Sequence, residues 1–209
     1  MRILLIMPDA HMHKLRIGPF LRSMREAPLT LTTLAALVPP WPDIEVKLAD
    51  GSVDAIPMDE PADLVGISVI TGCARPAYAL ARHFRRRGIP VVLGGVHVTI
   101  LPGEAIQHAD SIVIGRAEQA WPRLIEDFRA GGLKRVYRED PLEDDVLAGV
   151  PSPRRDLQRQ SGYMLPNTIQ ATRGCKRVCD FCTVNAVWPG YLKRPVADVI
   201  RDIRNLRGR

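Results

Sequence analysis

The sequence predicts an α/β protein whose first part is a five-stranded parallel sheet covered by helices. Short apolar runs alternate with segments of helical periodicity over about the first 130 residues, which is typical of strands joined by helical crossovers. Glycines stand where the helical segments end. The longest apolar runs fall well short of the ~20 residues that a membrane helix needs. We therefore expect a globular, soluble protein without a membrane span.

Five apolar runs are the predicted strands, and they cover residues 3–7, 44–49, 63–70, 90–94 and 111–115. Three sets of apolar residues between them recur at i, i+3, i+4 and i+7, the spacing of one helix face. These sets are Leu31, Leu34, Ala35 and Val38; Ala77, Leu80, Ala81 and Phe84; and Trp121, Leu124, Ile125 and Phe128. Gly88 and Gly131 follow the last two sets. The pattern predicts a Rossmann-like (flavodoxin-like) domain over residues 1–136.

The alternation stops in residues 137–166, which are predicted to be an interdomain connector. This stretch begins with the acidic run REDPLEDD and continues with VPSPRRDLQRQSG, a composition typical of linkers. A strand at residues 168–171, a cysteine-rich loop and one amphipathic helix follow. The apolar face of that helix holds Val196, Val199, Ile200, Ile203 and Leu206. Because one strand and one helix cannot bury their own apolar faces, we expect residues 167–209 to be the first βα unit of a truncated second domain.

Composition and charge narrow the possible partners. The 209 residues are 46% hydrophobic, enough to bury a core. The formal net charge of +6 is concentrated in residues 151–209, which hold 12 Lys and Arg against 4 Asp and Glu. These charges are spread over the connector and one helix face with few aromatic residues among them, so a nucleic-acid partner is not expected. The N-terminus has no basic flank followed by a cleavage site, and we expect a cytoplasmic protein.

Three of the four cysteines stand close together in the stretch TRGCKRVCDFCTV. Cys175, Cys179 and Cys182 are spaced C-x3-C-x2-C, and thiolates prefer zinc or iron-sulfur clusters. A zinc site usually adds further Cys or His ligands, yet the last histidine of the chain is His108. Three thiolates can hold a 4Fe-4S cluster with one iron left open for a small molecule. The pattern favours such a cluster, with a zinc site or a disulfide as the alternatives.

The loops that follow the predicted strands are the candidate binding site, because ligands of parallel sheets bind at the carboxyl ends of the strands. Glycines in these loops let the backbone approach a large, flat ligand closely. No G-x-G-x-x-G follows the first strand, which disfavours a nicotinamide dinucleotide. The candidate residues are Ser68 and Thr71 after the third strand, Gly94, Gly95, Val96 and His97 after the fourth, and Gly115 and Glu118 after the fifth.

The segment CKRVCDFC resembles the C-x3-C-x-aromatic-C motif of the radical S-adenosylmethionine (radical SAM) superfamily, with Phe181 in the aromatic position. The resemblance implies that Cys175, Cys179 and Cys182 hold a 4Fe-4S cluster and that S-adenosylmethionine binds its open iron, with Phe181 beside it. It also implies reductive cleavage of S-adenosylmethionine, with electrons from a donor such as flavodoxin or ferredoxin.

The first part of the chain resembles the cobalamin-binding domain of class B radical SAM enzymes. The loop Gly94–Thr99 with Pro102 matches that family's fourth-strand loop, whereas GRAE at 115–118 departs from the usual G-E-G-E at Arg116 and Ala117. The resemblance implies that cobalamin contacts the candidate residues named above. Some cobalamin proteins supply an axial histidine from a D-x-H-x-x-G loop; here Lys14 replaces the glycine, so His11 is interpreted as an ordinary loop residue.

Together these motifs indicate the N-terminal part of a cobalamin-dependent radical SAM enzyme. The chain is similar to members of the family that act as magnesium-protoporphyrin IX monomethyl ester oxidative cyclases or that modify hopanoids. This similarity implies methyl transfer or oxidative cyclisation at an unactivated carbon of a small-molecule substrate that the sequence does not specify. The alternative is a non-catalytic cobalamin-binding module whose cysteines hold zinc or nothing.

Overall fold

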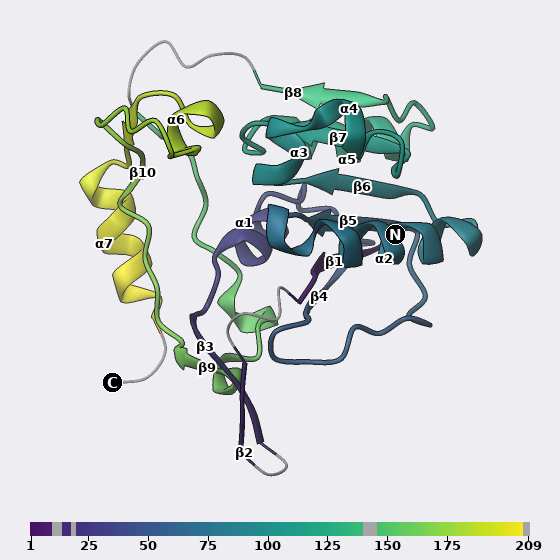
Figure 1. Cartoon of the computed structure of the whole chain (residues 1–209), viewed down its shortest axis with the longest axis horizontal. Helices are drawn as coiled ribbons and strands as arrows, with labels where there is room; N and C mark the ends of the chain where they lie inside the picture. The colour runs from purple at the N-terminus through teal and green to yellow at the C-terminus, as the bar shows by residue number, and fades with distance from the viewer. Residues whose placement is uncertain (10–13, 18–19, 140–145, 207–209) are drawn as a thin grey trace.

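The centre of the computed structural model is a six-stranded parallel sheet with the strand order β4-β1-β5-β6-β7-β8 (Figure 1). The structure describes residues 1–9, 14–17, 20–139 and 146–206, and for residues 14–17 and 20–25 it describes the backbone alone. The strands of this sheet are β1 (Arg2–Met7), β4 (Glu45–Asp50), β5 (Leu64–Ser68), β6 (Val91–Gly94), β7 (Ser111–Ile114) and β8 (Val136–Arg138). The α/β, Rossmann-like fold and its five expected strands are confirmed.

The additional strand, β8, lies at the edge of the sheet next to β7. It is only three residues long, and of its side chains only Tyr137 is buried. Such a short edge strand has too few apolar residues to show a period, so the sequence did not reveal it.

Helices cover both faces of the sheet, as Figure 1 shows. The buried side chains of α2, α3 and α4 pack on one face and those of α1 and α5 on the other. The bounds of these helices are α1 (Thr30–Ala36), α2 (Ala74–Arg86), α3 (Val96–Ile100), α4 (Pro102–Ala105) and α5 (Ala120–Arg129), and a 3-10 turn, η1 (Thr71–Cys73), precedes α2. Gly88 and Gly131 adopt positive φ angles of 75° and 76° just after α2 and α5, which confirms the predicted helix ends.

A second, three-stranded sheet joins distant parts of the sequence. It consists of β2 (Lys14–Ile17), β3 (Phe20–Glu26) and β9 (Tyr163–Leu165), with β2 antiparallel and β9 parallel to β3. The Tyr163 hydroxyl donates a 2.7 Å hydrogen bond to Asp50 Oδ2 at the end of β4. The residues predicted to be the connector therefore fold back against the first part of the chain. No strand was expected at residues 14–26.

The cysteine-rich part contains a third sheet and the predicted helix. Its elements are β10 (Thr172–Gly174), α6 (Val184–Val187), β11 (Tyr191–Lys193) and α7 (Val196–Arg204), and two 3-10 turns, η2 (Arg155–Leu157) and η3 (Gln160–Gly162), precede them. The strands β10 and β11 pair in the antiparallel sense. The strand predicted at 168–171 is displaced to 172–174, because Thr168 Oγ1 and the Gln170 carbonyl instead bond to Ala27 and Arg194.

A buried ion pair fastens α7 to this part of the chain. Arg194 Nη1 lies 2.6 Å from Asp202 Oδ2, and the two side chains are 3% and 0% exposed. The Ser152 hydroxyl donates a further 2.5 Å hydrogen bond to Asp202. The apolar face of α7 points away from these contacts, with Val196 73% exposed. Polar contacts thus anchor the helix while its predicted apolar face stays largely uncovered in the described part of the chain.

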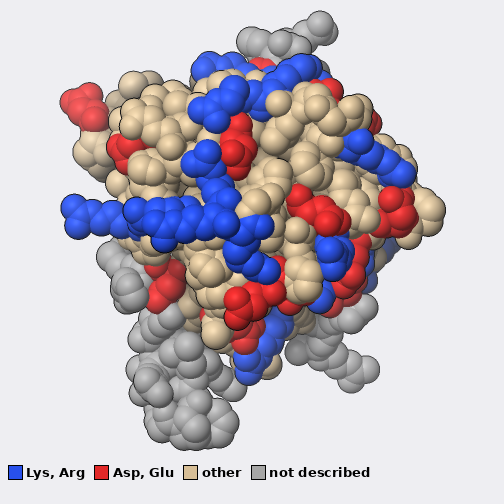
Figure 2. All heavy atoms as spheres, turned by 90° about the vertical axis from the view of Figure 1, so that its right-hand side faces the viewer, with Lys and Arg blue, Asp and Glu red and all other residues tan. Residues whose placement is uncertain are grey.

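Acidic and basic side chains lie next to one another on the face that the right-hand side of Figure 1 presents (Figure 2). Ion pairs such as Arg2–Asp63 at 3.4 Å and Arg85–Asp110 at 3.1 Å join residues of opposite charge on the surface. Such exposed pairs contribute little to stability. None of the helices in the described ranges is long and apolar enough to cross a membrane.

Replacement of Phe84, which is fully buried between α2 and the sheet, tests this packing. We expect Phe84→Ala to lower the free energy of unfolding by about 3–5 kcal/mol, because it leaves a cavity in a close-packed core. Urea unfolding followed by circular dichroism measures the change. Met164→Ala, at a side chain that is 55% exposed, serves as the control. A similar loss in both variants would contradict the packing described for α2.

Candidate functional site

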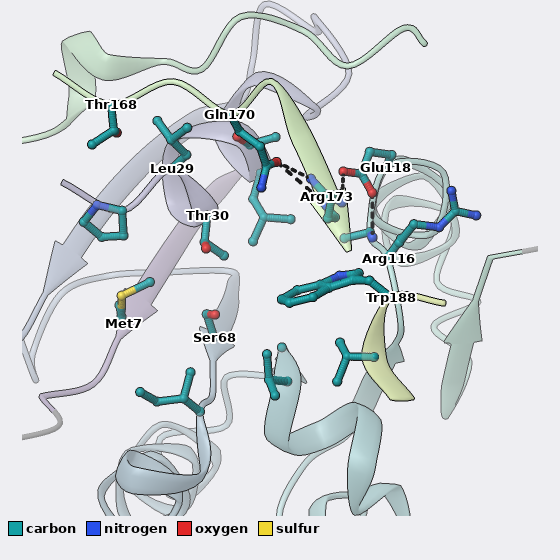
Figure 3. Close-up of a pocket in the computed structure, with 18 of the residues that line it drawn as sticks. Met7, Leu29, Thr30, Ser68, Arg116, Glu118, Thr168, Gln170, Arg173 and Trp188 are labelled. Atoms are coloured by element: carbon teal, nitrogen blue, oxygen red, sulfur yellow. Dashed lines mark hydrogen bonds and ion pairs between the residues drawn. The ribbon is translucent and has the colours of Figure 1, made fainter. Parts of the chain in front are cut away.

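A cavity of about 770 Å³ opens at the carboxyl ends of β1, β5, β6 and β7. Met7, Ser68, Gly95 and Gly115 line it where these strands end, as expected for a parallel sheet. Residues 168–173 and Trp188 close the opposite side, and Figure 3 shows the Trp188 indole extending into the cavity. The site is therefore built from both parts of the chain. Its volume falls within the range of about 300–1,000 Å³ that is usual for ligand pockets.

Most of the cavity wall is apolar. Leu29, just before α1, and Thr30 and Leu34 within it line the cavity, and the turn before α2 contributes Ile70 and Cys73. Thr30 and Ser68 present hydroxyl groups on the inner surface (Figure 3). A wall of this kind suits a large ligand with an apolar body and a few hydrogen-bonding groups.

Two glycines shape the wall nearest the sheet. Gly95 has a φ of 101°, and a Cβ there would lie 2.8 Å from the Val69 carbonyl oxygen. Gly115 has a φ of 80°, and a Cβ there would point into open space. Both positions adopt backbone conformations that favour glycine. Neither residue places a side chain in the cavity, so the backbone after β6 and after β7 is open to a ligand there.

The polar rim of the cavity is made by residues that follow β7 and residues of the closing segment. Arg173 Nη1 lies 2.6 Å from Glu118 Oε1, and Gln170 Oε1 accepts a 2.9 Å hydrogen bond from Arg173 Nη2 (Figure 3). Arg116 lies 3.5 Å from Glu139. Burial raises the pKa of Glu139, while backbone N–H donation from Gln119 at the start of α5 opposes this.

The predicted site residues divide into two groups. The residues that line the cavity are Ser68, Gly95, Val96, Gly115 and Glu118. Gly94 lines a smaller cavity of about 50 Å³, which shares Ser68 and Gly95 with the large one. Thr71 and His97 are not among the lining residues, and His11 lies outside the described residues. The structure thus brings the glycine-rich loops together around one cavity, as predicted.

His97 points into the protein interior. Its side chain is 3% exposed, its Nε2 is 2.9 Å from the Tyr78 hydroxyl and its Nδ1 is 3.3 Å from Thr71 Oγ1. Glu104 lies 3.5 Å from Nε2, and the Tyr78 ring stacks on His108 with ring centroids 3.9 Å apart. The histidine therefore ties α3 to α2 directly behind the Gly95 wall. In this arrangement it supports the cavity from outside.

The three motif cysteines follow β10 directly, in the loop that leads to α6. The Cys182 N–H donates to the Cys179 carbonyl at 3.0 Å, and the Arg177 N–H donates to Cys175 Sγ at 3.4 Å. All three thiols are free, and Phe181 is 91% exposed. Within the described ranges, no three His, Cys, Asp or Glu side chains stand close enough to hold a metal ion. Thiolates suit a soft metal centre, but the three thiols of the described loop do not lie close enough together to form one.

Several cavity residues on the closing segment were not predicted from the sequence. Trp188, Arg173 and Gln170 all line the cavity, although they lie far along the chain from the glycine-rich loops. The only signal in the sequence was their position, since Arg173 directly precedes the Gly-Cys of the motif and Trp188 follows it closely. Nothing in a single sequence shows that this segment folds over the carboxyl edge of the sheet.

Residues 22–125 match the model of the B12 binding domain family. This segment contains β5, β6 and β7 with the glycine-rich loops that line the cavity. Residues 22–125 thus belong to the B12-binding domain family, which confirms the predicted cobalamin-binding class.

The chain is also similar to two enzymes of Chlorobaculum tepidum. It is 35% identical over 160 residues to bacteriochlorophyllide d C-8(2)-methyltransferase, covering 74% of this chain and 35% of that protein. It is 31% identical over 183 residues to bacteriochlorophyllide d C-12(1)-methyltransferase, covering 84% and 39%. An uncharacterized protein of Methanopyrus kandleri is 24% identical over 195 residues, covering 69% and 36%. The chain therefore spans little more than a third of these relatives.

Titration of Tyr78 tests the network behind the cavity. Burial, reinforced by the Glu104 carboxylate, raises the pKa of Tyr78. An unfolded tyrosine ionises near pH 10, so above about pH 10 the unfolded state binds fewer protons and the free energy of unfolding falls as the pH rises. Tyr78→Phe removes this titration. Above about pH 10 we expect the slope of the free energy of unfolding against pH to be shallower in this variant than in the wild type, by about 1.4 kcal/mol per pH unit. Urea unfolding at a series of alkaline pH values measures both slopes; equal slopes would contradict the network.

Proposed function

We propose that the chain is the N-terminal part of a cobalamin-dependent radical SAM methyltransferase. One observation carries this proposal: the segment that closes the cavity of the B12-binding domain runs directly into the three-cysteine loop. A cofactor in the cavity and a cluster on the loop would then face a common space. Both Chlorobaculum tepidum relatives are methyltransferases, which favours methyl transfer over oxidative cyclisation.

The cavity suits the corrin of cobalamin. Gly95 and Gly115 keep the wall along β6 and β7 free of side chains, and the hydroxyls of Ser68 and Thr30 offer hydrogen bonds to amide groups at the corrin edge. Cobalamin would supply the cobalt that carries the methyl group. Glu118 and Arg173 would bound the ring edge on the side of the cysteine loop.

Cys175, Cys179 and Cys182 would hold a 4Fe-4S cluster, with S-adenosylmethionine on the open iron. The exposed ring of Phe181 stands in the loop where it can pack against that cofactor. A reduced flavodoxin or ferredoxin would supply the electron. The substrate is a small molecule with an unactivated carbon, bound with the help of parts of the enzyme beyond those described.

A second candidate function is a cobalamin-binding module whose cysteines hold zinc or no metal. The observation that favours it is the separation of the three thiols within the described loop. Binding of cobalamin is common to both candidates, so only the content of the cysteine loop separates them.

Filling the cavity tests the cobalamin site. Ser68 lies at the end of β5 and points into the cavity (Figure 3), so Ser68→Phe places a ring where the corrin would lie. We expect the dissociation constant for hydroxocobalamin to rise at least about tenfold, which corresponds to ~1.4 kcal/mol. Absorption titration measures it. The exposed Ser161→Phe in η3 is the matched control, and equal affinity in both variants would place cobalamin elsewhere.

Iron binding separates the two candidate functions. After anaerobic reconstitution with iron and sulfide, we expect the wild-type chain to show absorption near 420 nm and an electron paramagnetic resonance signal of a reduced 4Fe-4S cluster, at about four irons per chain. The variant Cys175→Ala/Cys179→Ala/Cys182→Ala should lose both signals. Cys73→Ala, which removes a buried cysteine outside the loop, should keep them. Zinc or no metal in the wild-type chain would favour the binding module.

A further inference from the structure

The segment of residues 168–173, here called the roof strap, is held over the cavity by contacts to both parts of the chain. At its start, Thr168 Oγ1 donates a 2.7 Å hydrogen bond to the Ala27 carbonyl. From behind, the buried Arg155 donates to the Thr168 carbonyl at 2.7 Å and Arg194 to the Gln170 carbonyl at 3.1 Å. At its end, the side chain of Arg173 reaches across to Glu118. This last contact is the ion pair that ties the strap to the loop after β7.

The Arg173–Glu118 ion pair is shielded from water, and further hydrogen bonds orient both of its side chains. The two side chains are 14% and 13% exposed, so water screens their attraction less than that of a surface pair. Gln170 accepts hydrogen bonds from Nε and Nη2 of Arg173, which fixes the plane of the guanidinium. The Ala117 N–H donates to Glu118 Oε2, which orients the carboxylate. The guanidinium and the carboxylate are thus both held in the orientation that their ion pair requires.

The backbone of Arg173 is rigidly connected to the cysteine loop. Arg173 pairs with Leu192 in the β10-β11 ladder, and the Cys175 N–H donates to the Gly190 carbonyl at 3.1 Å. Gly174 between them has a φ of 87°, and a Cβ there would collide with the Gly190 carbonyl. The two strands therefore fit tightly at this point. A displacement of Arg173 has to move Cys175 as well.

Both members of the pair also line the cavity, together with Trp188, which precedes β11. A large group that fills the cavity therefore contacts the strap from inside. A shift that it imposes on Glu118 passes through Arg173 to β10, where the cysteine loop begins, and a shift of Trp188 passes to α6, where the loop ends. Filled and empty cavities would favour different arrangements of that loop, which is the condition for coupling between two sites.

We propose that Arg173 and Glu118 are positioning residues which couple occupation of the cavity to the arrangement of the cysteine loop. The inference rests on the proposed function, because the occupant of the cavity is taken to be cobalamin. When the corrin is bound, the ion pair holds the cysteine loop at the opening of the cavity. The three thiols come close enough together to bind a cluster only when the cavity is occupied. By thermodynamic linkage, a cluster on the loop must tighten cobalamin binding by the same factor.

Hydrogen–deuterium exchange of the 209-residue chain tests this coupling, with methylcobalamin in the dark as the probe. In the wild-type chain we expect methylcobalamin to slow amide exchange of residues 175–183 several-fold. In Arg173→Met and in Glu118→Gln we expect weaker methylcobalamin binding, because both side chains line the cavity. At methylcobalamin concentrations that saturate each variant in an absorption titration, the slowing in this loop should nevertheless be lost. Arg173→Lys keeps the charge and should retain most of it. Exchange within α2 reports whether each variant is folded.

Arg177→Met is the matched control, because Arg177 lies in the same loop and its side chain forms no ion pair among the described residues. It should behave as the wild type. Undiminished slowing of amide exchange in the loop of Arg173→Met would overturn the coupling. Loss of all methylcobalamin binding in both Arg173→Met and Glu118→Gln would also overturn it, because these residues would then be direct ligands of the cofactor. Binding to the wild-type chain without slower loop exchange would overturn the coupling and leave the proposed function intact. No binding to the wild-type chain would overturn both.

Discussion

The parallel pairing of β1, β5, β6 and β7 is the constraint on which the rest of the structure depends. Residues 3–6 of β1 are fully buried because helices cover both faces of the sheet, and a strand of this kind has to be apolar throughout. Parallel strands all end at the same edge. The loops after them, with Ser68, Gly95 and Gly115, are therefore brought together whatever their separation in the sequence. The cavity is a direct consequence of this geometry.

Polar contacts, by contrast, place the cysteine-rich part on that edge. The Ser152 hydroxyl, which donates to Asp202, and the Val150 carbonyl, which accepts from Arg194, hold α7 against the connector. The ion pair Arg173–Glu118 joins the roof strap to the sheet domain. Buried ion pairs add little net stability because desolvation offsets their attraction, but their directionality defines a specific geometry. An apolar interface would tolerate sliding between the two parts. The charged contacts fix which side chains face the cavity.

The elements that the sequence predicts and those that it does not follow the same division. The central strands could be predicted because burial on both faces makes each of them a continuous apolar run. The apolar faces of α2 and α5 could be predicted because burial of one helix face imposes a period of 3.6 residues on the sequence. The glycine loops could be predicted because positive φ angles select glycine at Gly95. The strand β8 could not be predicted because three residues are too few to show a period. The pairing of β3 with β9 joins residues about 140 positions apart, and the position of β10 depends on the bonds of Thr168 and Gln170 to Ala27 and Arg194. The interior position of His97 is fixed by Tyr78, on another helix, and neither residue carries that information alone.

The parallel pairing of β3 with β9 also affects how the chain is made. Residues 23 and 26 of β3 lie opposite residues 163 and 165 of β9, so the partner strand leaves the ribosome about 140 residues later, roughly ten seconds at ordinary rates of synthesis. Throughout that interval one edge of β3 has no native partner, and an unpaired strand edge can join a neighbouring nascent chain. Translation of the intervening B12-binding segment therefore sets how long each newly made molecule is exposed to misassembly.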